Sequence, residues 1–148
     1  MIFGYVEALI PFYFGIPGVK LGLPNIITVF ALYTLPVYQV FAIQVMRIVL
    51  VSFLFGNLSM MLYSLAGGLL SLAVMGLLKK KKWLSIAGVS IAGGVSHNIG
   101  QLAVAVLVVQ NLKIAFYLPA LLASGLVTGG LIGMLVHKVK PLLDRSKF

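Results

Sequence analysis

Long apolar stretches fill almost the whole of this chain of 148 residues. Hydrophobic residues make up 61% of the sequence, and charged residues only 9%. A helix needs about 20 apolar residues to cross the ~30 Å hydrocarbon core of a bilayer, where every backbone group must be hydrogen-bonded within the protein. The sequence therefore predicts an all-α integral membrane bundle that forms a single domain over residues 1–148, with no room for a soluble catalytic domain.

Proline, glycine and lysine residues divide the chain into six apolar blocks. Met1–Ile10 is too short to cross a bilayer, so we expect the first helix to be about half missing, through a late start or a naturally short helix. Pro11–Lys20, rich in proline, glycine and aromatic residues, predicts an ordered loop at the interface. The other blocks predict helices over 21–35, 37–55, 58–78, 83–109 and 114–139, with Pro141 beyond the last.

Most of the basic residues occur in a lysine run, Lys79–Lys82, and in the C-terminal tail from Lys138 onward. Both places lie at the ends of apolar blocks, which is typical of orientation by the positive-inside rule. We expect both to be cytoplasmic and to attract anionic lipid headgroups, with Lys20 and Lys113 on the opposite side. Charges grouped in this way do not indicate a nucleic-acid partner.

Arg47 interrupts the block 37–55 near its middle. A charged side chain at this depth costs at least about 2.5–3.5 kcal/mol on insertion scales, so it requires a partner or a function. Glu7 is the only acidic residue within the predicted spans, which makes an ion pair between Glu7 and Arg47 one interpretation. Contact with a ligand is the other, and the two can coexist.

A second polar cluster, His97, Asn98 and Gln101, lies near the middle of the block 83–109. A lone buried histidine is more often a satisfied core residue than a ligand-binding one. Three neighbouring polar side chains beside the glycine pair Gly93-Gly94 favour a binding surface, because glycines can loosen a helix and expose its backbone toward a cavity.

Lys20 and Asn25 flank the outer end of the block 21–35. A helix N-terminus with a lysine beside it favours anions, so both residues are candidates for ligand binding. The alternative for Lys20 is a side chain that extends along apolar surface to the interface.

Gly125, Gly129 and Gly133 recur every four residues in the last block. Such a doubled GxxxG pattern lets two helix backbones approach closely. The pattern predicts either packing within the chain or docking of a helix from a partner.

Residues for catalysis are scarce in this chain. It has no cysteine and only two acidic residues, Glu7 and Asp144, at opposite ends of the predicted bundle. Metal-assisted diphosphate chemistry needs carboxylates to hold Mg²⁺, and zinc binding would have to use the distant pair His97 and His137. We therefore expect no enzyme activity, no metal site and no cofactor in this chain.

Several strings point to one family, and they follow its order over almost the whole chain. They are Pro17–Thr28, the Arg47 helix ending at Phe55-Gly56, Ser64–Gly68 and Val95–Gln101. In these strings the chain resembles the heptaprenyl diphosphate synthase component I family, also called Gx transporters, which in turn is similar to the substrate-binding S components of energy-coupling-factor (ECF) transporters. The chain departs from the family at Pro24, where an alanine is expected, and in lacking much of helix one, which in S components faces the coupling subunit.

The resemblance implies six helices in a bacterial cytoplasmic membrane, with a ligand pocket toward the outer face. It also implies docking to a transmembrane coupling subunit and two ATPase subunits. The ATPase subunits would use the ATP that drives import. The preferred hypothesis is thus an S component of an ATP-driven importer, whose small-molecule pocket is capped by the loop 11–20. Its predicted lining is Lys20, Asn25, Arg47, His97, Asn98 and Gln101.

Two other hypotheses remain at this point. In the first, the chain is a non-catalytic membrane partner, component I, of a heptaprenyl diphosphate synthase in menaquinone biosynthesis. It would anchor a soluble enzyme through the lysine run or the basic tail. In the second, it is a self-associating helical channel built on the face Gly125–Gly133.

Overall fold

A computed structural model describes residues 25–145, and this part of the chain is helical without strands. The short block Met1–Ile10 and the loop Pro11–Lys20 lie outside the described residues. The described residues contain five α-helices and one 3-10 helix, whereas six helices were predicted for the whole chain. The first predicted helix lies outside the described residues, so it stays a prediction.

Four stretches of the described chain are long and apolar enough to cross a membrane, and one further apolar helix is too short. The chain is accordingly a multi-pass membrane protein, as predicted. The elements are α2 (Asn25–Thr34), α3 (Val37–Phe55), α4 (Leu58–Lys81), α5 (Ile86–Val109), η1 (Leu112–Tyr117) and α6 (Leu118–Arg145).

The helix ends follow from local chemistry. Asn57 caps α4 by accepting from the backbone N–H of Met60 at 2.9 Å, and Ser85 caps α5 by accepting from that of Gly88 at 3.3 Å. Side-chain oxygens at this position satisfy donors that have no partner in the first turn. At its other end α4 continues through three lysines and stops at Lys82, whose backbone is left-handed with φ 55°.

The predicted end of the last helix before Pro141 is wrong, because α6 continues through this residue to Arg145. A proline inside a helix removes one backbone hydrogen bond and crowds the preceding turn. Both effects fall on the turn before the proline, so helical backbone can continue after it, and a single further turn follows Pro141 here.

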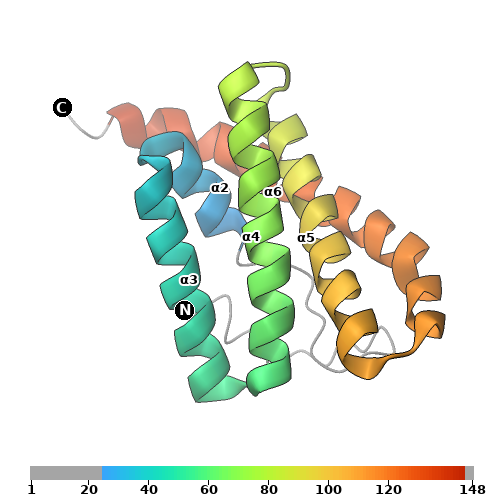
Figure 1. The fold of residues 1–148 in the computed structure, drawn as a ribbon. Coiled ribbons are helices and arrows are strands. Elements are labelled where there is room, and N and C mark those ends of the chain that lie inside the picture. Colours follow the sequence, from blue (N-terminus) through green and yellow to red (C-terminus); the bar gives the residue numbers. More distant parts are fainter. Residues whose placement is uncertain (1–24, 146–148) are drawn as a thin grey trace.

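Figure 1 shows α4 between α3 and α5, with α6 crossing behind them. The short helix α2, about 15 Å long at helical rise, contacts all four of the longer helices. Its residues Val29 and Leu32 belong to the main apolar core, which also includes Met75 of α4 and Val136 of α6. Helix α2 is therefore an interior element enclosed by the longer helices.

Glycines bring α5 into backbone contact with α6. A Cβ atom added to Gly125 would lie 2.9 Å from the carbonyl oxygen of Gly94, and one added to Gly129 would lie 2.7 Å from Cα of Ile91. Gly133 meets Ala87 in the same way. The glycine face of α6 is thus occupied by α5, and packing within the chain accounts for it.

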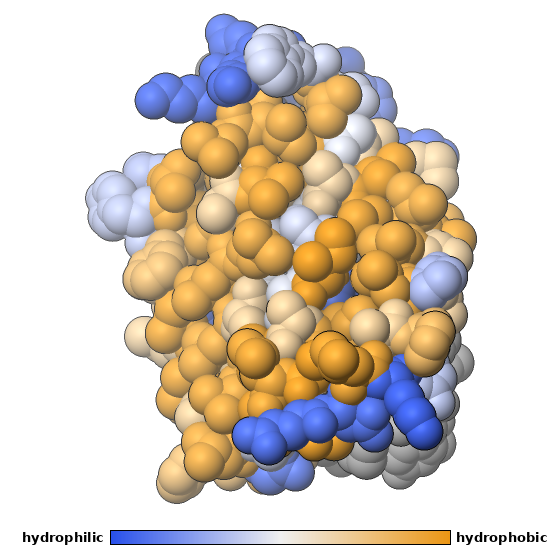
Figure 2. Space-filling model, turned by 45° about the vertical axis from the view of Figure 1, so that its right-hand side comes forward, coloured by the Kyte–Doolittle hydropathy of each residue, from blue (hydrophilic) through white to orange (hydrophobic). Residues whose placement is uncertain are grey.

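The outer surface is apolar between two hydrophilic ends. Figure 2 shows a broad hydrophobic band on the face in view, with hydrophilic residues above and below it. Large apolar side chains extend outward from α3, for example Phe53, which is 87% exposed, and Met46. Such exposure suits side chains that contact lipid tails.

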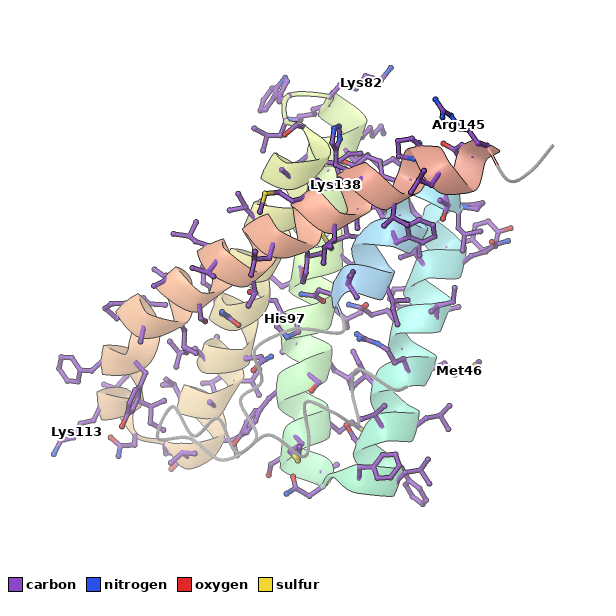
Figure 3. All side chains as sticks on the ribbon, turned by 180° about the vertical axis from the view of Figure 1, so that it is seen from behind. Met46, Lys82, His97, Lys113, Lys138 and Arg145 are labelled. Carbon is purple, nitrogen blue, oxygen red and sulfur yellow. The ribbon has the colours of Figure 1, made fainter. Side chains whose placement is uncertain are left out.

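Basic residues are concentrated at one of the two hydrophilic ends. Lys82, Lys138 and Arg145 lie at the same end of the bundle, and Lys113 lies at the other (Figure 3). The lysine run and the described part of the basic tail are therefore at one end, as the charge pattern predicted. That this end is cytoplasmic stays a prediction.

The contact between α5 and α6 predicts that two neighbouring substitutions differ in their effect on stability. Gly129→Ala should lower the free energy of unfolding by about 1–3 kcal/mol, because the new methyl group meets the backbone of Ile91 and the helices must separate. Gly130→Ala is the matched control, since its methyl group would only reach Ile91 side-chain atoms at 3.9 Å. Thermal unfolding of both variants in detergent measures the difference, and equal stabilities would contradict the described packing.

Candidate functional site

The side chain of Gln44 on α3 joins three helices. Its Nε2 group donates to the backbone carbonyl of Gly68 on α4 at 2.8 Å, and its Oε1 atom accepts a hydrogen bond from the hydroxyl of Thr28 on α2. Gln44 is only 1% exposed, so water does not compete for these bonds. An amide with two donors and two acceptor positions is well suited to such a junction.

Arg47 lies three residues after Gln44 on the same face of α3. Its Nη2 group donates to Oε1 of Gln44 at 3.3 Å, so the guanidinium is tied to the same junction. Arg47 is half-buried, whereas the preceding residue, Met46, is exposed and directed away from the bundle in Figure 3. The predicted ion pair with Glu7 involves a residue outside the described part of the chain.

His97 and Gln101 of α5 form the second polar contact, in which the Gln101 side-chain amide hydrogen-bonds Nε2 of His97. They are 5% and 0% exposed, and Figure 3 shows His97 directed into the bundle. Both lie against Gly67 of α4, whose missing side chain leaves room for the imidazole and the Gln101 stem. The i, i+4 spacing puts them on one helix face.

The adjacent glycines Gly67 and Gly68 bring the two contacts to the same level of the bundle. Gly67 faces α5 and Gly68 faces α3, because consecutive residues point about 100° apart on a helix. A larger residue at either position would collide with the polar side chains on its side. We call the resulting set the polar layer: Thr28, Gln44, Arg47, His97 and Gln101.

Asn98, which was predicted to line the same pocket, points in another direction. Its Nδ2 group donates to the carbonyl oxygen of Leu121 at 2.6 Å and to the hydroxyl of Ser124 at 3.1 Å, both on α6. The structure thus separates Asn98 from His97 and Gln101, since neighbouring residues of a helix occupy different faces. Its observed contacts join α5 to α6.

Asn25 lies at the beginning of the short interior helix α2 and is 4% exposed. Its Oδ1 atom has no hydrogen-bond partner among the described residues. Thr28, a member of the polar layer, follows Asn25 by three residues on the same helix. Asn25 and Thr28 therefore lie on the same side of α2, about one turn apart. Lys20 and the loop 11–20, the other predicted parts of this corner, lie outside the described residues.

Two members of the polar layer, Thr28 and Gln44, and the backbone carbonyl that Gln44 binds were not identified from the sequence as parts of the site. Gln44 precedes Arg47 by three residues, and this spacing was the available signal for it. Thr28 follows Asn25 by three residues, and this spacing on an apolar helix was the available signal. The carbonyl of Gly68 is a backbone group, and no residue type indicates that such a group faces a side chain from another helix.

The polar layer can bind by hydrogen bonding and by charge. It supplies a guanidinium, an imidazole, two carboxamides and a hydroxyl, without a carboxylate. The described residues also contain no group of three or more histidine, cysteine, aspartate or glutamate residues that could hold a metal ion. Donors of this kind suit an anionic or carbonyl-bearing molecule.

Comparison with known proteins identifies one family. The sequence model of the family described as heptaprenyl diphosphate synthase component I matches residues 1–139 of the chain. No curated protein and no solved structure matches the chain. These findings support the synthase-component interpretation of the sequence, and they give no support to the interpretation as a component of an ECF transporter.

The junction at Gln44 predicts a large effect of removing one amide. Gln44→Leu should lower the free energy of unfolding by about 1–3 kcal/mol, because Gly68, Thr28 and Arg47 each lose a buried hydrogen-bond partner. Gln39→Leu near the beginning of the same helix is the control, since its amide donates to the exposed Tyr38 hydroxyl. Unfolding curves in detergent that coincide for the two variants would show that the junction contributes no stability.

Proposed function

The chain belongs to the heptaprenyl diphosphate synthase component I family, and on this basis we propose that it is the non-catalytic membrane partner of a heptaprenyl diphosphate synthase in menaquinone biosynthesis. The family match over residues 1–139 is the observation that carries this proposal. The chain itself is not an enzyme. In this role the bundle keeps the synthase at the bilayer, the site into which a product with a long hydrocarbon chain must be delivered.

The charge distribution supports docking of a soluble partner at one end. Lys79–Lys82 and the helix end that carries Lys138, Lys140 and Arg145 lie together, and among the described residues only Asp144 adds a negative charge there. A surface with one sign of charge accelerates and orients the approach of an oppositely charged protein. We propose that this end faces the cytoplasm and receives an acidic surface of the synthase.

Lys79 differs from its neighbours in the lysine run because its side chain contacts helix α2. Its Nζ group donates to the backbone carbonyl of Leu32 and lies 5.2 Å from the ring centroid of Tyr33, both on α2. A cation near the last turn of a helix stabilises carbonyls that lack partners there. Lys79 thus fastens the interior helix to the basic end, and Lys80, Lys81 and Lys82 are the residues available for docking.

This role predicts capture of the soluble synthase from the same organism. The wild-type chain in nanodiscs should retain the purified synthase, and K80Q/K81Q/K82Q should reduce its affinity about tenfold through the lost charge complementarity. Lys113→Gln, which removes a charge from the opposite end, is the matched control. The proposal is overturned if wild-type nanodiscs retain no more synthase than empty ones.

The polar layer supports a second candidate function, the binding of a small molecule as in an S component. Structural packing rarely needs an arginine, a histidine and two amides at one level of a membrane bundle, since each is costly there. The inward-facing His97 and the tie between Arg47 and Gln44 are the specific observations in its favour. In this proposal Asn25 and the outer parts Lys20 and 11–20 complete the site.

A small-molecule ligand of the polar layer would raise the thermal stability of the protein. Molecules that co-purify in detergent can be identified by mass spectrometry, and saturation at a hundred times the Kd should add about 2.7 kcal/mol. Arg47→Ala and His97→Ala should abolish this increment. Asn98→Ala is the control, because it should lower the stability of the ligand-free protein and leave the increment unchanged. An increment that survives both Arg47→Ala and His97→Ala would place the ligand elsewhere.

A further inference from the structure

Four basic side chains at the charged end of the bundle have no partner among the described residues. Lys79 is bound to α2, Lys81 lies 4.4 Å from the ring centroid of Trp83, and Lys140 pairs with Asp144 at 3.3 Å. The remaining cations make no ion pair, hydrogen bond or ring contact through their side chains within residues 25–145. They are Lys80, Lys82, Lys138 and Arg145, all exposed.

These four residues come from two different helices. Lys80 and Lys82 are at the end of α4, and Lys138 and Arg145 are on the last turns of α6. Figure 3 shows Lys82, Lys138 and Arg145 at the same end, where the two helices finish. The positive-inside rule explains why cations collect at one end of a membrane protein, but it does not require that they be unpaired or drawn from two helices.

An apolar surface begins directly beside these cations. Leu77 and Leu84 flank the lysine run, and Val139 and Leu142 follow Lys138 on α6; all four are exposed. The hydrophobic band in Figure 2 reaches the hydrophilic end without a wide polar margin. A molecule with a multiply charged head and a hydrocarbon tail can therefore place its head among the cations and its tail along the band.

We propose that Lys80, Lys82, Lys138 and Arg145 form a receiving surface for the diphosphate head of a polyprenyl diphosphate, whose chain lies in the bilayer beside α4 and α6. The identity of this ligand rests on the proposed function, because the partner synthase would release an amphiphile of this chemistry. A diphosphate concentrates more negative charge than a phosphodiester lipid headgroup, and Arg145 can bind its oxygens in a bidentate manner. The surface thus takes the product from the synthase at the membrane.

Trp83 provides a direct reporter for this binding. It is the only tryptophan in the chain, and it lies within the lysine run at 71% exposure. Heptaprenyl diphosphate titrated into wild-type nanodiscs of phosphatidylcholine should change the Trp83 emission in a saturable way. Heptaprenol, which has the same chain without the diphosphate, should give no saturable change.

Two double variants on separate helices test the assignment of residues. K80Q/K82Q and K138Q/R145Q should each weaken binding of heptaprenyl diphosphate about tenfold or more, because each removes two charges at the membrane surface. Lys113→Gln at the opposite end should leave binding unchanged. Since the substituted side chains are exposed, both variants should fold, which circular dichroism and size-exclusion chromatography check. Wild-type affinity in both double variants would overturn the proposal.

Two further measurements separate this inference from its alternatives. Nanodiscs containing phosphatidylglycerol should retain saturable binding; complete loss would show a surface for anionic lipid in general and overturn the proposal. Synthase capture is measured on the same nanodiscs without prenyl diphosphate. If the synthase is retained while heptaprenyl diphosphate gives no signal, this inference fails and the proposed function stands. If heptaprenyl diphosphate binds but no synthase is retained, the proposed function fails and the surface is a diphosphate site of another origin.

Discussion

The bundle depends on the close approach of α5 to both of its neighbours. Glycines of α6 admit the backbone of α5 on one side, and Gly67 of α4 admits the carbonyl of His97 on the other. In a bilayer no hydrophobic effect drives helices together, so van der Waals contact and interhelical hydrogen bonds must hold them. Such contacts weaken steeply with distance, and a single methyl group in these positions would separate the helices.

The same close approach makes an interior polar layer possible. Because α4 presents Gly67 and Gly68 instead of larger side chains, the Gln44 amide reaches the Gly68 carbonyl, and the hydrogen-bonded pair His97 and Gln101 fits between α4 and α5. Buried hydrogen bonds between helices fix the relative positions of the helices more narrowly than apolar packing does. The layer also joins α2 to α3, and Lys79 fastens the other end of α2 to the basic surface.

The molecule therefore has two chemically distinct regions connected by one short helix. The polar layer lies between helices that are long and apolar enough to cross a membrane. The basic residues Lys82, Lys138 and Arg145 lie at one end of the bundle, where the two proposed partners would bind. Helix α2 contacts both regions, through the Thr28 hydroxyl at the polar layer and through the Leu32 carbonyl at Lys79.

The sequence was sufficient to predict the membrane class, the boundaries of α3, the grouping of the basic residues and the family. Each of these depends on local composition or on a contiguous stretch of sequence. The end of α6 was predicted wrongly at Pro141, since propensity cannot tell whether one more turn is tolerated. The sequence also identified Arg47, His97 and Gln101, because burying a polar or charged side chain in an apolar environment costs free energy. Only the tertiary structure decided that Arg47 binds Gln44 and that His97 and Gln101 lie against α4 while Asn98 binds α6, because a side chain's partners depend on how each helix is rotated about its axis. Residue spacing within one helix does not specify that rotation.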